Sequence, residues 1–221
     1  MGSQVLIDIL ASSITFGTLL LMAIRLNGSV SESMQQYNGD LVVQSSIVTA
    51  VQMIENDFRK IGYCQIPENL PDPTQAILLA DSNRIKFQTD LCDKLHPDGD
   101  GIVDVVYYYL GPTSELSMTP NPNDRILYRV VNNEQPKGAN LGITLFDLKF
   151  FSAGNSTPYD DTLTFPITGV TLGKISAMRI TLKVENMAAA PLKYNTAKFD
   201  NQYSSAFWRQ VRLVSRNLKD R

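Results

Sequence analysis

An apolar stretch near the N-terminus places the strongest constraint on what this chain can fold into. Residues 5–26 read VLIDILASSITFGTLLLMAIRL, and Asp8 and Arg25 are the only charged side chains among them. A helix of about 20 apolar residues is long enough to cross a bilayer. The stretch lacks the basic start and the small-x-small cleavage pattern of an ordinary secretory signal. We therefore expect it to form a membrane-anchoring helix.

The helical pattern continues beyond the apolar stretch. Apolar residues recur three or four positions apart and form one stripe along a helix. They are Ile47, Val51, Ile54, Phe58 and Ile61. Gly62 supplies a stop after this stripe, and Asp57 is predicted to lie on the polar face. We expect one helix from about residue 4 to about residue 61, loosened near residues 27–30 and 38–40, because glycine costs about 1 kcal/mol relative to alanine in a helix.

After Gly62 the hydrophobic period changes to two, which is typical of half-buried antiparallel strands. The predicted strands are residues 84–88, 103–110, 125–131, 144–151, 176–184 and 207–215. Connectors rich in proline, glycine and asparagine separate these runs. We assign no structure to the longest of them, which are residues 65–76, 112–124, 152–174 and 187–206.

The predicted fold class is α+β. A sheet with one apolar face needs a cover, and the stripe at residues 47–61 is the only amphipathic helix available. The second half of the helix should therefore pack on a mainly antiparallel sheet, while the apolar half projects. We expect three parts: an apolar helix at 1–29, the amphipathic half of the helix at 30–62, and a β-rich domain at 63–221.

Charge and motifs exclude several functions. The formal net charge is -2 and no basic block is present, so nucleic acid is not expected as a partner. The chain has one histidine, His96, and two cysteines without CxxC spacing. It also lacks nucleophile-elbow, phosphate-loop and zinc-protease motifs, so we expect no enzymatic activity.

Five segments, taken in order, resemble type IV pilin-like proteins, namely minor pilins and the larger pseudopilins of type II secretion. They are MGSQVLID, IENDFRKIGYC, RIKFQTDLCDKLHPDGDGIVDVVYYYLG, ILYRVVNN and RLVSRNL. The first is similar to a shortened leader junction, in which Gly2 and Ser3 end the leader and Gln4 begins the mature chain. Asp8 then falls at mature position five, where the family usually carries glutamate.

The resemblance implies a structural subunit of a type IV pilus-like or type II secretion filament. Before assembly the chain would cross the bacterial inner membrane once, with its globular domain in the periplasm. After assembly its helix would pack with other pilin-like subunits, and the domain would reach the cell surface. The alternative is a signal-anchored periplasmic or surface ligand-binding domain that does not polymerise.

Asp8 is the candidate assembly residue. A carboxylate within an apolar helix is costly and is seldom without a role. In a filament it would pair with the N-terminal ammonium of a neighbouring subunit. The other interpretation is an interfacial aspartate near a helix N-terminus, where the helix dipole favours negative charge.

An aspartate-rich segment lies between the first two predicted strands. Asp98, Asp100 and Asp104 surround two glycines, at a spacing that resembles turns that hold Ca²⁺. An Asp-Gly pair also favours a tight turn between strands. The sequence therefore leaves two interpretations open, a calcium site and a plain hairpin turn.

Cys64 and Cys92 would both lie outside the cytoplasm if the first helix is an anchor. A disulfide between them would stabilise the domain by about 3–4 kcal/mol in the chain-entropy model. We expect this bridge, with two free thiols as the alternative.

Overall fold

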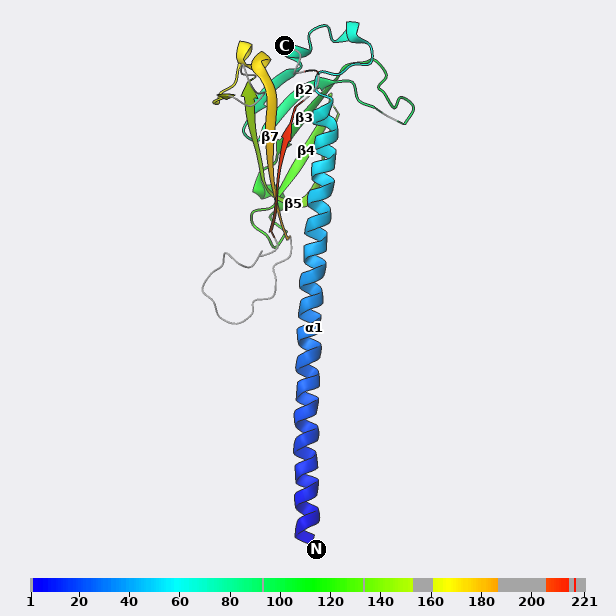
Figure 1. Cartoon of the computed structure of the whole chain (residues 1–221), viewed down its shortest axis with the longest axis vertical. Helices are drawn as coiled ribbons and strands as arrows, with labels where there is room; N and C mark the ends of the chain where they lie inside the picture. The colour runs from blue at the N-terminus through cyan, green and yellow to red at the C-terminus, as the bar shows by residue number, and fades with distance from the viewer. Residues whose placement is uncertain are drawn as a thin grey trace. The chain divides into compact units, whose positions relative to one another are not determined.

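A single long helix precedes a β-sheet (Figure 1). The computed structural model describes residues 2–92, 94–132, 134–152, 161–186, 206–214 and 217. Its helix and strands are α1 (Gly2–Arg59), β1 (Ile77–Asp81), β2 (Arg84–Thr89), β3 (Asp104–Leu110), β4 (Arg125–Val131), β5 (Lys137–Ser152), β6 (Asp161–Thr162), β7 (Ile175–Glu185) and β8 (Ala206–Leu213). Short 3-10 helices are η1 (Pro67–Asn69), η2 (Pro73–Gln75), η3 (Thr113–Leu116) and η4 (Gly169–Lys174).

Helix α1 is continuous from Gly2 to Arg59. The predicted loosening near Gly28 and Gly39 is therefore wrong. Glycine weakens a helix through its entropy in the unfolded chain, but it adopts helical backbone angles without strain. Gly62 follows the helix with a positive φ of 76°, which confirms the predicted stop.

The chain divides by its contacts into two units, residues 1–41 and 42–221. Helix α1 runs through both. The second unit holds the end of the helix together with the sheet, which gives the domain its cover. The boundary drawn at residue 29 marks the end of the apolar segment and stays a prediction.

The strands form one antiparallel sheet in the order β1-β2-β3-β4-β5-β7-β8, with β6 pairing with β5. The α+β fold class is confirmed. The sheet curls, because the turn between β1 and β2 returns to β5, where the Leu148 amide donates a 2.7 Å hydrogen bond to the Ser82 carbonyl. The Leu163 amide bonds the Phe150 carbonyl of the same strand at 2.9 Å. The long β5 is therefore hydrogen-bonded along both edges.

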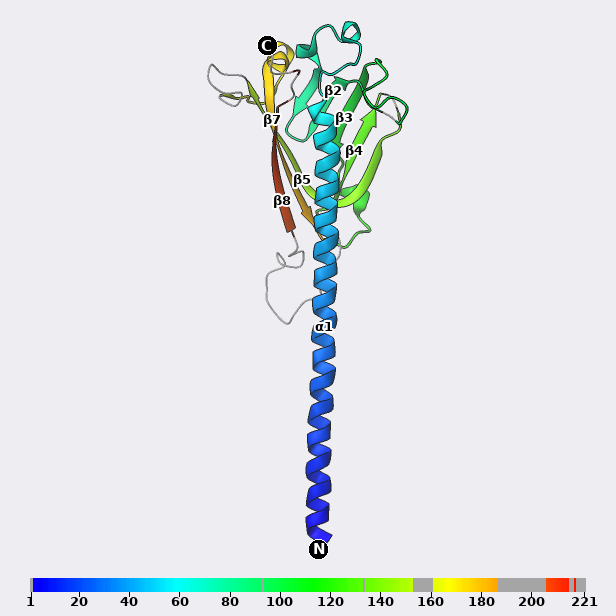
Figure 2. The same ribbon diagram turned by 45° about the vertical axis from the view of Figure 1, so that its right-hand side comes forward.

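The last turns of α1 lie against the sheet in both ribbon views (Figure 1; Figure 2). All five residues of the predicted stripe, from Ile47 to Ile61, are buried. Phe58 is fully buried and meets Phe87 and Tyr108 edge to face, with ring centroids 5.3 and 5.4 Å away. Such edge-to-face pairs add to the hydrophobic gain of burying the rings. The stripe is thus the centre of the core.

Asp57 lies within this buried stripe and not on the polar face, which corrects the sequence-based placement. The residue is 4% exposed. Its Oδ2 accepts hydrogen bonds from the Tyr108 hydroxyl at 2.7 Å and from Arg129 Nε at 2.6 Å. A charge buried in a core must be paired and hydrogen-bonded, and β3 and β4 supply both partners.

All six predicted strands are present, and five of them lie within two residues of their expected ends, whereas β5 begins seven residues before the predicted start at 144. β1 and β6 were missed, because both lie in or beside segments predicted as loops. Those connectors also carry η1 to η4. The predicted connector 187–206 lies almost wholly outside the described residues.

We predict that Phe58→Ala lowers the free energy of unfolding by about 3–5 kcal/mol, because it removes a ring at the centre of the core. Val48→Ala, on the exposed side of the same helix, should change it by less than about 0.5 kcal/mol. Urea unfolding of residues 30–221, which retain every buried core residue, measures both. Equal losses for the two variants would contradict this account of the core.

Candidate functional site

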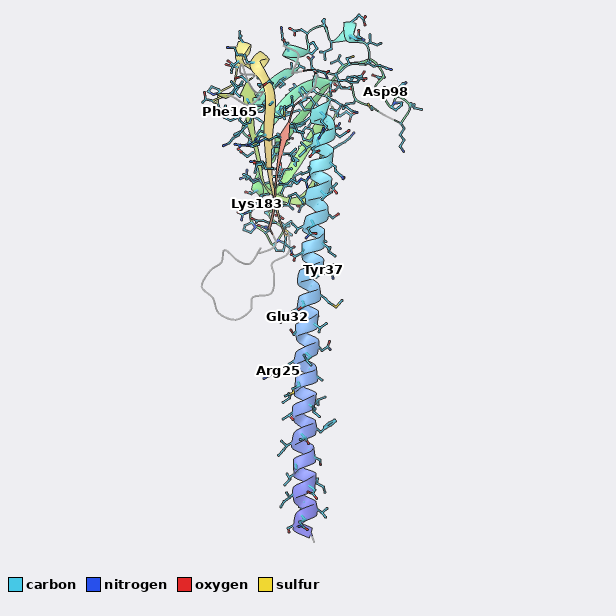
Figure 3. The ribbon with its side chains drawn as sticks, viewed as in Figure 1. Arg25, Glu32, Tyr37, Asp98, Phe165 and Lys183 are labelled. Carbon is cyan, nitrogen blue, oxygen red and sulfur yellow. The ribbon has the colours of Figure 1, made fainter. Side chains whose placement is uncertain are left out.

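The apolar half of α1 is exposed along its length (Figure 3). Among the described residues it is the one helix long and apolar enough to cross a membrane, and none of its most apolar window is buried. Ser3 and Gln4, the predicted junction residues, lie exposed in its first turn after Gly2. Their processing stays a prediction. The segment predicted to be an anchor is therefore part of one continuous helix, and its most apolar residues are exposed.

Asp8 projects from this helix without an ion pair or side-chain hydrogen bond to any described residue. Arg25 likewise has no ion pair within the described chain. The two residues are 17 positions apart, or roughly 25 Å along a helix. Neither charge can therefore neutralise the other in one copy of the chain.

The aspartate-rich segment is organised by Asp90, a residue that the sequence did not single out. Its carboxylate is fully buried. It accepts hydrogen bonds from the backbone amides of Gln65, Asp100 and Gly101 at 2.9–3.1 Å. Gly99 has a φ of 107°, and a side chain there would overlap the Asp90 carboxylate. The glycines therefore let the turn wrap closely around a buried acid.

The predicted calcium ligands do not converge. Asp100 Oδ1 accepts from the Ile102 amide, while Asp104 accepts from the Leu91 amide and the Asn132 side chain. Asp98 is exposed. No three His, Cys, Asp or Glu side chains lie together as metal ligands in the described ranges. Of the two interpretations left open by the sequence, the geometry of the described residues therefore favours the turn.

The predicted disulfide is also wrong, because Cys64 and Cys92 are both free thiols. Cys64 is buried, and its sulfur lies 3.5 Å from the Gly101 carbonyl oxygen. Burial raises the pKa of this thiol. Cys92 Sγ instead accepts from Lys60 Nζ at 2.9 Å. The two sulfurs are engaged with different partners.

We predict that Asp90→Ala lowers the free energy of unfolding by at least about 3 kcal/mol, because three backbone amides lose their buried acceptor. Asp98→Ala, in the same turn but exposed, should cost less than about 0.5 kcal/mol. Thermal and urea unfolding of residues 30–221 tests the pair. A small loss for Asp90→Ala would show that the turn is held by other contacts.

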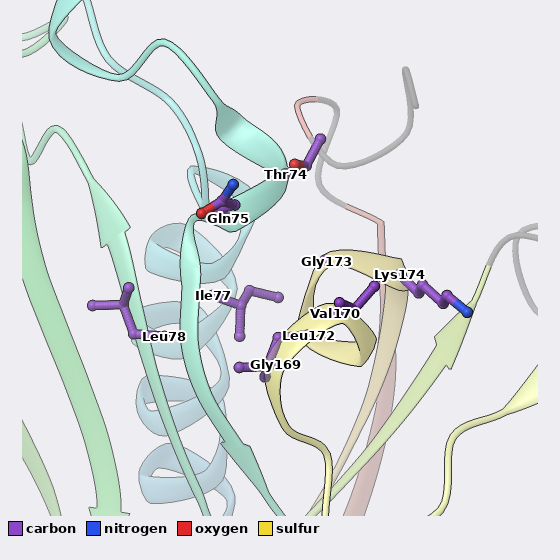
Figure 4. A pocket seen from close by; sticks show the side chains of 9 residues that line it. All are labelled: Thr74, Gln75, Ile77, Leu78, Gly169, Val170, Leu172, Gly173 and Lys174. Carbon is purple, nitrogen blue, oxygen red and sulfur yellow. The ribbon is translucent and has the colours of Figure 1, made fainter.

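A pocket of about 630 Å³ lies between η2, the start of β1 and η4 (Figure 4). Its lining is Thr74, Gln75, Ile77, Leu78, Gly169, Val170, Leu172, Gly173 and Lys174. Lys174 is the only charged lining residue. The other lining side chains are apolar or uncharged polar groups. The pocket is therefore suited to packing or to an apolar ligand.

Three tyrosines stack on the outer face of the sheet. Tyr107 and Tyr109 of β3 have centroids 4.9 Å apart, and Tyr109 and Tyr128 of β4 are 5.0 Å apart. A side chain at Gly138 would overlap the Tyr128 ring, so glycine is needed in β5 opposite it. Each inner ring face is covered by a neighbour, and this cross-strand stacking stabilises the sheet.

A second buried acid lies before β4. Asp124 is 1% exposed, and neither carboxylate oxygen has a well-aligned hydrogen bond to a described residue. Burial, aided by the charge of Glu185, raises the pKa of Asp124 to about 6, although nearby Thr119 and Asn140 favour its ionised form. Glu185 is itself paired with Lys183. Asp124 therefore ionises at a cost to the folded state.

We predict that Asp124 makes the domain less stable as pH rises from about 4 to about 6. The pKa of Asp124 in the folded state lies above the unfolded value of about 3.9, so between these two values the folded state binds the proton more tightly than the unfolded state. The free energy of unfolding therefore falls as pH rises through this interval. The loss should be on the order of 2 kcal/mol. Unfolding of residues 30–221 against pH should show this slope reduced in Asp124→Asn. Parallel curves for the two proteins would contradict it.

Sequence reasoning missed three polar residues that hold the domain together or strain it: Asp57, Asp90 and Asp124. Asp57 carried a usable signal, because it lies three positions after Ile54 and so falls on the stripe. Asp90 and Asp124 carried none, since their surroundings come from residues distant in the chain.

The comparisons with known proteins are sparse. No family model matches the sequence, and no curated protein matches it. Among solved structures, the chain is similar to a type IV-like pilin from Thermus thermophilus. The two are 12% identical, with a TM-score of 0.40, and the match covers 80% of this chain and 98% of that chain.

Proposed function

We propose that this chain is a structural subunit, a minor pilin or pseudopilin, of a type IV pilus-like or type II secretion filament. Its apolar helix crosses the bacterial inner membrane once, with the sheet domain in the periplasm. On assembly the helix leaves the lipid and packs with the helices of other subunits. The domain then faces outward, and no residue has a catalytic role.

The contrast between the two halves of α1 carries this proposal. The apolar stripe of the second half, from Val43 to Ile61, is buried in the core that it forms with the sheet. The first half has large apolar side chains exposed by half or more, such as Leu6, Phe16 and Leu21. Exposed apolar surface of this extent marks a membrane or a protein partner. A filament subunit uses both in succession.

Asp8 supports assembly over simple anchoring. Asp8 lies within the apolar stretch, three residues after Val5, and a carboxylate at the centre of a membrane helix costs about 2.5–3.5 kcal/mol on insertion scales. An anchor gains nothing from this cost. In a filament, the carboxylate can meet the α-amino group of a neighbouring subunit, which repays the cost through a buried, hydrogen-bonded pair.

The alternative function is an anchored periplasmic or surface ligand-binding domain that never polymerises. The pocket beside η4 and the tyrosine stack are the surfaces that such a domain would use. Crosslinking separates the two functions: a filament subunit crosslinks to its neighbours through its first 30 residues, and an isolated anchored domain does not.

We predict that Asp8→Ala leaves membrane insertion intact, since it removes a charge from the apolar helix. It should reduce incorporation into filaments several-fold, because the neighbour's positive group loses its partner. Asp8→Glu should be milder, as it keeps the charge. The measurement is the amount of each variant in membrane and sheared-filament fractions.

Ser12→Ala, one turn further along the same helix, is the matched control and should leave both fractions unchanged. Normal incorporation of Asp8→Ala would contradict the pairing and favour the anchored domain.

A further inference from the structure

Three basic residues lie directly opposite one another across β5, β7 and β8, which lie side by side at one edge of the sheet (Figure 2). In the strand pairing, Lys149 faces Arg179, and Arg179 faces Arg212. Leu148 and Ile180, their neighbours along β5 and β7, are buried in the core, so the basic side chains are on the outer face. We call Lys149, Arg179 and Arg212 the basic row. Like charges at directly opposite positions destabilise a sheet, so the row carries a cost.

The charges of Lys149 and Arg179 are not paired with an acid in the part of the chain that the structure describes. Asp147 is two residues before Lys149 on the same face, but it forms no ion pair with a described residue. The Arg179 guanidinium instead lies over the Phe151 ring, with Cζ 5.7 Å from the ring centroid. Phe151 follows Lys149 by two residues, so Arg179 leans away from Asp147. Arg179 Nε is buried and has no hydrogen bond to a described residue.

The basic row is accessible from outside the domain. Lys149 and Arg212 are exposed, and Arg179 is partly exposed. Arg212 already interacts within its own chain, so Lys149 and Arg179 are the charges available to a partner. A partner of opposite charge would remove the repulsion between them, and complementary charge is what guides such partners to a surface.

We propose that this face of the sheet docks an extended acidic segment of another protein, whose carboxylates pair with Lys149 and Arg179. Neighbouring strands are about 4.8 Å apart, so the basic row spans roughly 10 Å across three strands. Side chains two positions apart in an extended segment are on one side of it and roughly 7 Å apart. Two such carboxylates therefore fit within the row. The site belongs to the sheet domain, so it does not depend on whether α1 enters a filament.

An acidic peptide fits the basic row better than a small anion or a nucleic acid. Exposed charges are screened by salt, so one free anion gains little from them, whereas linked carboxylates bind together. Nucleic-acid sites combine a large basic surface with aromatic rings on which bases stack. Phe151, the ring beneath Arg179, is itself buried, and the net charge of the chain is -2. The row therefore suits a short segment with a few carboxylates.

Fluorescence anisotropy with the full-length chain in a neutral detergent tests the proposal. The probe is a labelled octaglutamate peptide, and octaglutamine is its uncharged control. Octaglutamate should bind at least tenfold more tightly than octaglutamine at low salt. Its binding should fall several-fold between about 0.03 M and about 0.3 M salt, because exposed charges are screened.

Substitutions locate the binding surface. Lys149→Glu and Arg179→Gln should each weaken octaglutamate binding at least fivefold. Lys86→Glu is the matched control, because Lys86 is an exposed lysine on the outer face of β2, and it should weaken binding less than twofold.

Thermal unfolding of the same variants separates lost binding from lost folding. Lys149→Glu places a carboxylate directly opposite Arg179, so it should raise the melting temperature by about 1–3 °C. Lys86→Glu should shift it by less than about 1 °C. A variant that melts at a higher temperature and binds less has lost the charge that the peptide needs, and not its fold.

Three outcomes would overturn the inference. Octaglutamate binding that Lys149→Glu and Arg179→Gln leave unchanged would show that the basic row is not the site. Tighter binding of a single-stranded oligonucleotide with the same number of charges, lost in the same two variants, would replace the acidic peptide by a nucleic acid. Inorganic phosphate that displaces octaglutamate at an equal concentration would show that linked charges are not required.

Discussion

The buried contact of Asp57 on α1 with Tyr108 and Arg129 of the sheet is the interaction on which the domain depends. The carboxylate lies inside an apolar stripe, so it is tolerable only with Tyr108 and Arg129 bound to it. Burial and the Asp57 charge raise the pKa of Tyr108 well above its usual value, so its hydroxyl stays protonated and donates. The two contacts therefore tie the last turns of α1 to β3 and β4.

Helix α1 has two parts that differ in the burial of their apolar side chains. From Val43 onward, α1 finds its partner in its own chain, and its apolar stripe disappears into the core. Before that point the large apolar side chains of the same helix, from Val5 to Val42, are exposed. Membrane and neighbouring subunits are the partners we propose for it, with Asp8 as the feature that favours a neighbouring helix over lipid alone.

Much of the fold was predictable because burial leaves a period in the sequence. The stripe from Ile47 to Ile61 and the alternation in β2 record which face each element buries. β1 was not predicted, because a bulge between Ile77 and Leu79 interrupts the alternation of buried and exposed side chains along it. The disulfide prediction and the calcium interpretation do not match the structure, and the reason lies in what spacing can report. Aspartate and cysteine spacing describes which groups are available, and not whether backbone amides or other partners have already engaged them.

The sequence by itself determined the long helix, its apolar and amphipathic halves, and the antiparallel sheet, since each follows from local periodicity and composition. Only the tertiary structure decided the roles of Asp57, Asp90 and Asp124. Each is a buried acid whose surroundings include groups from distant segments, which come together only in the folded chain. Periodicity reports which side of an element faces the core, whereas the partner that a buried charge meets there is settled by three-dimensional packing.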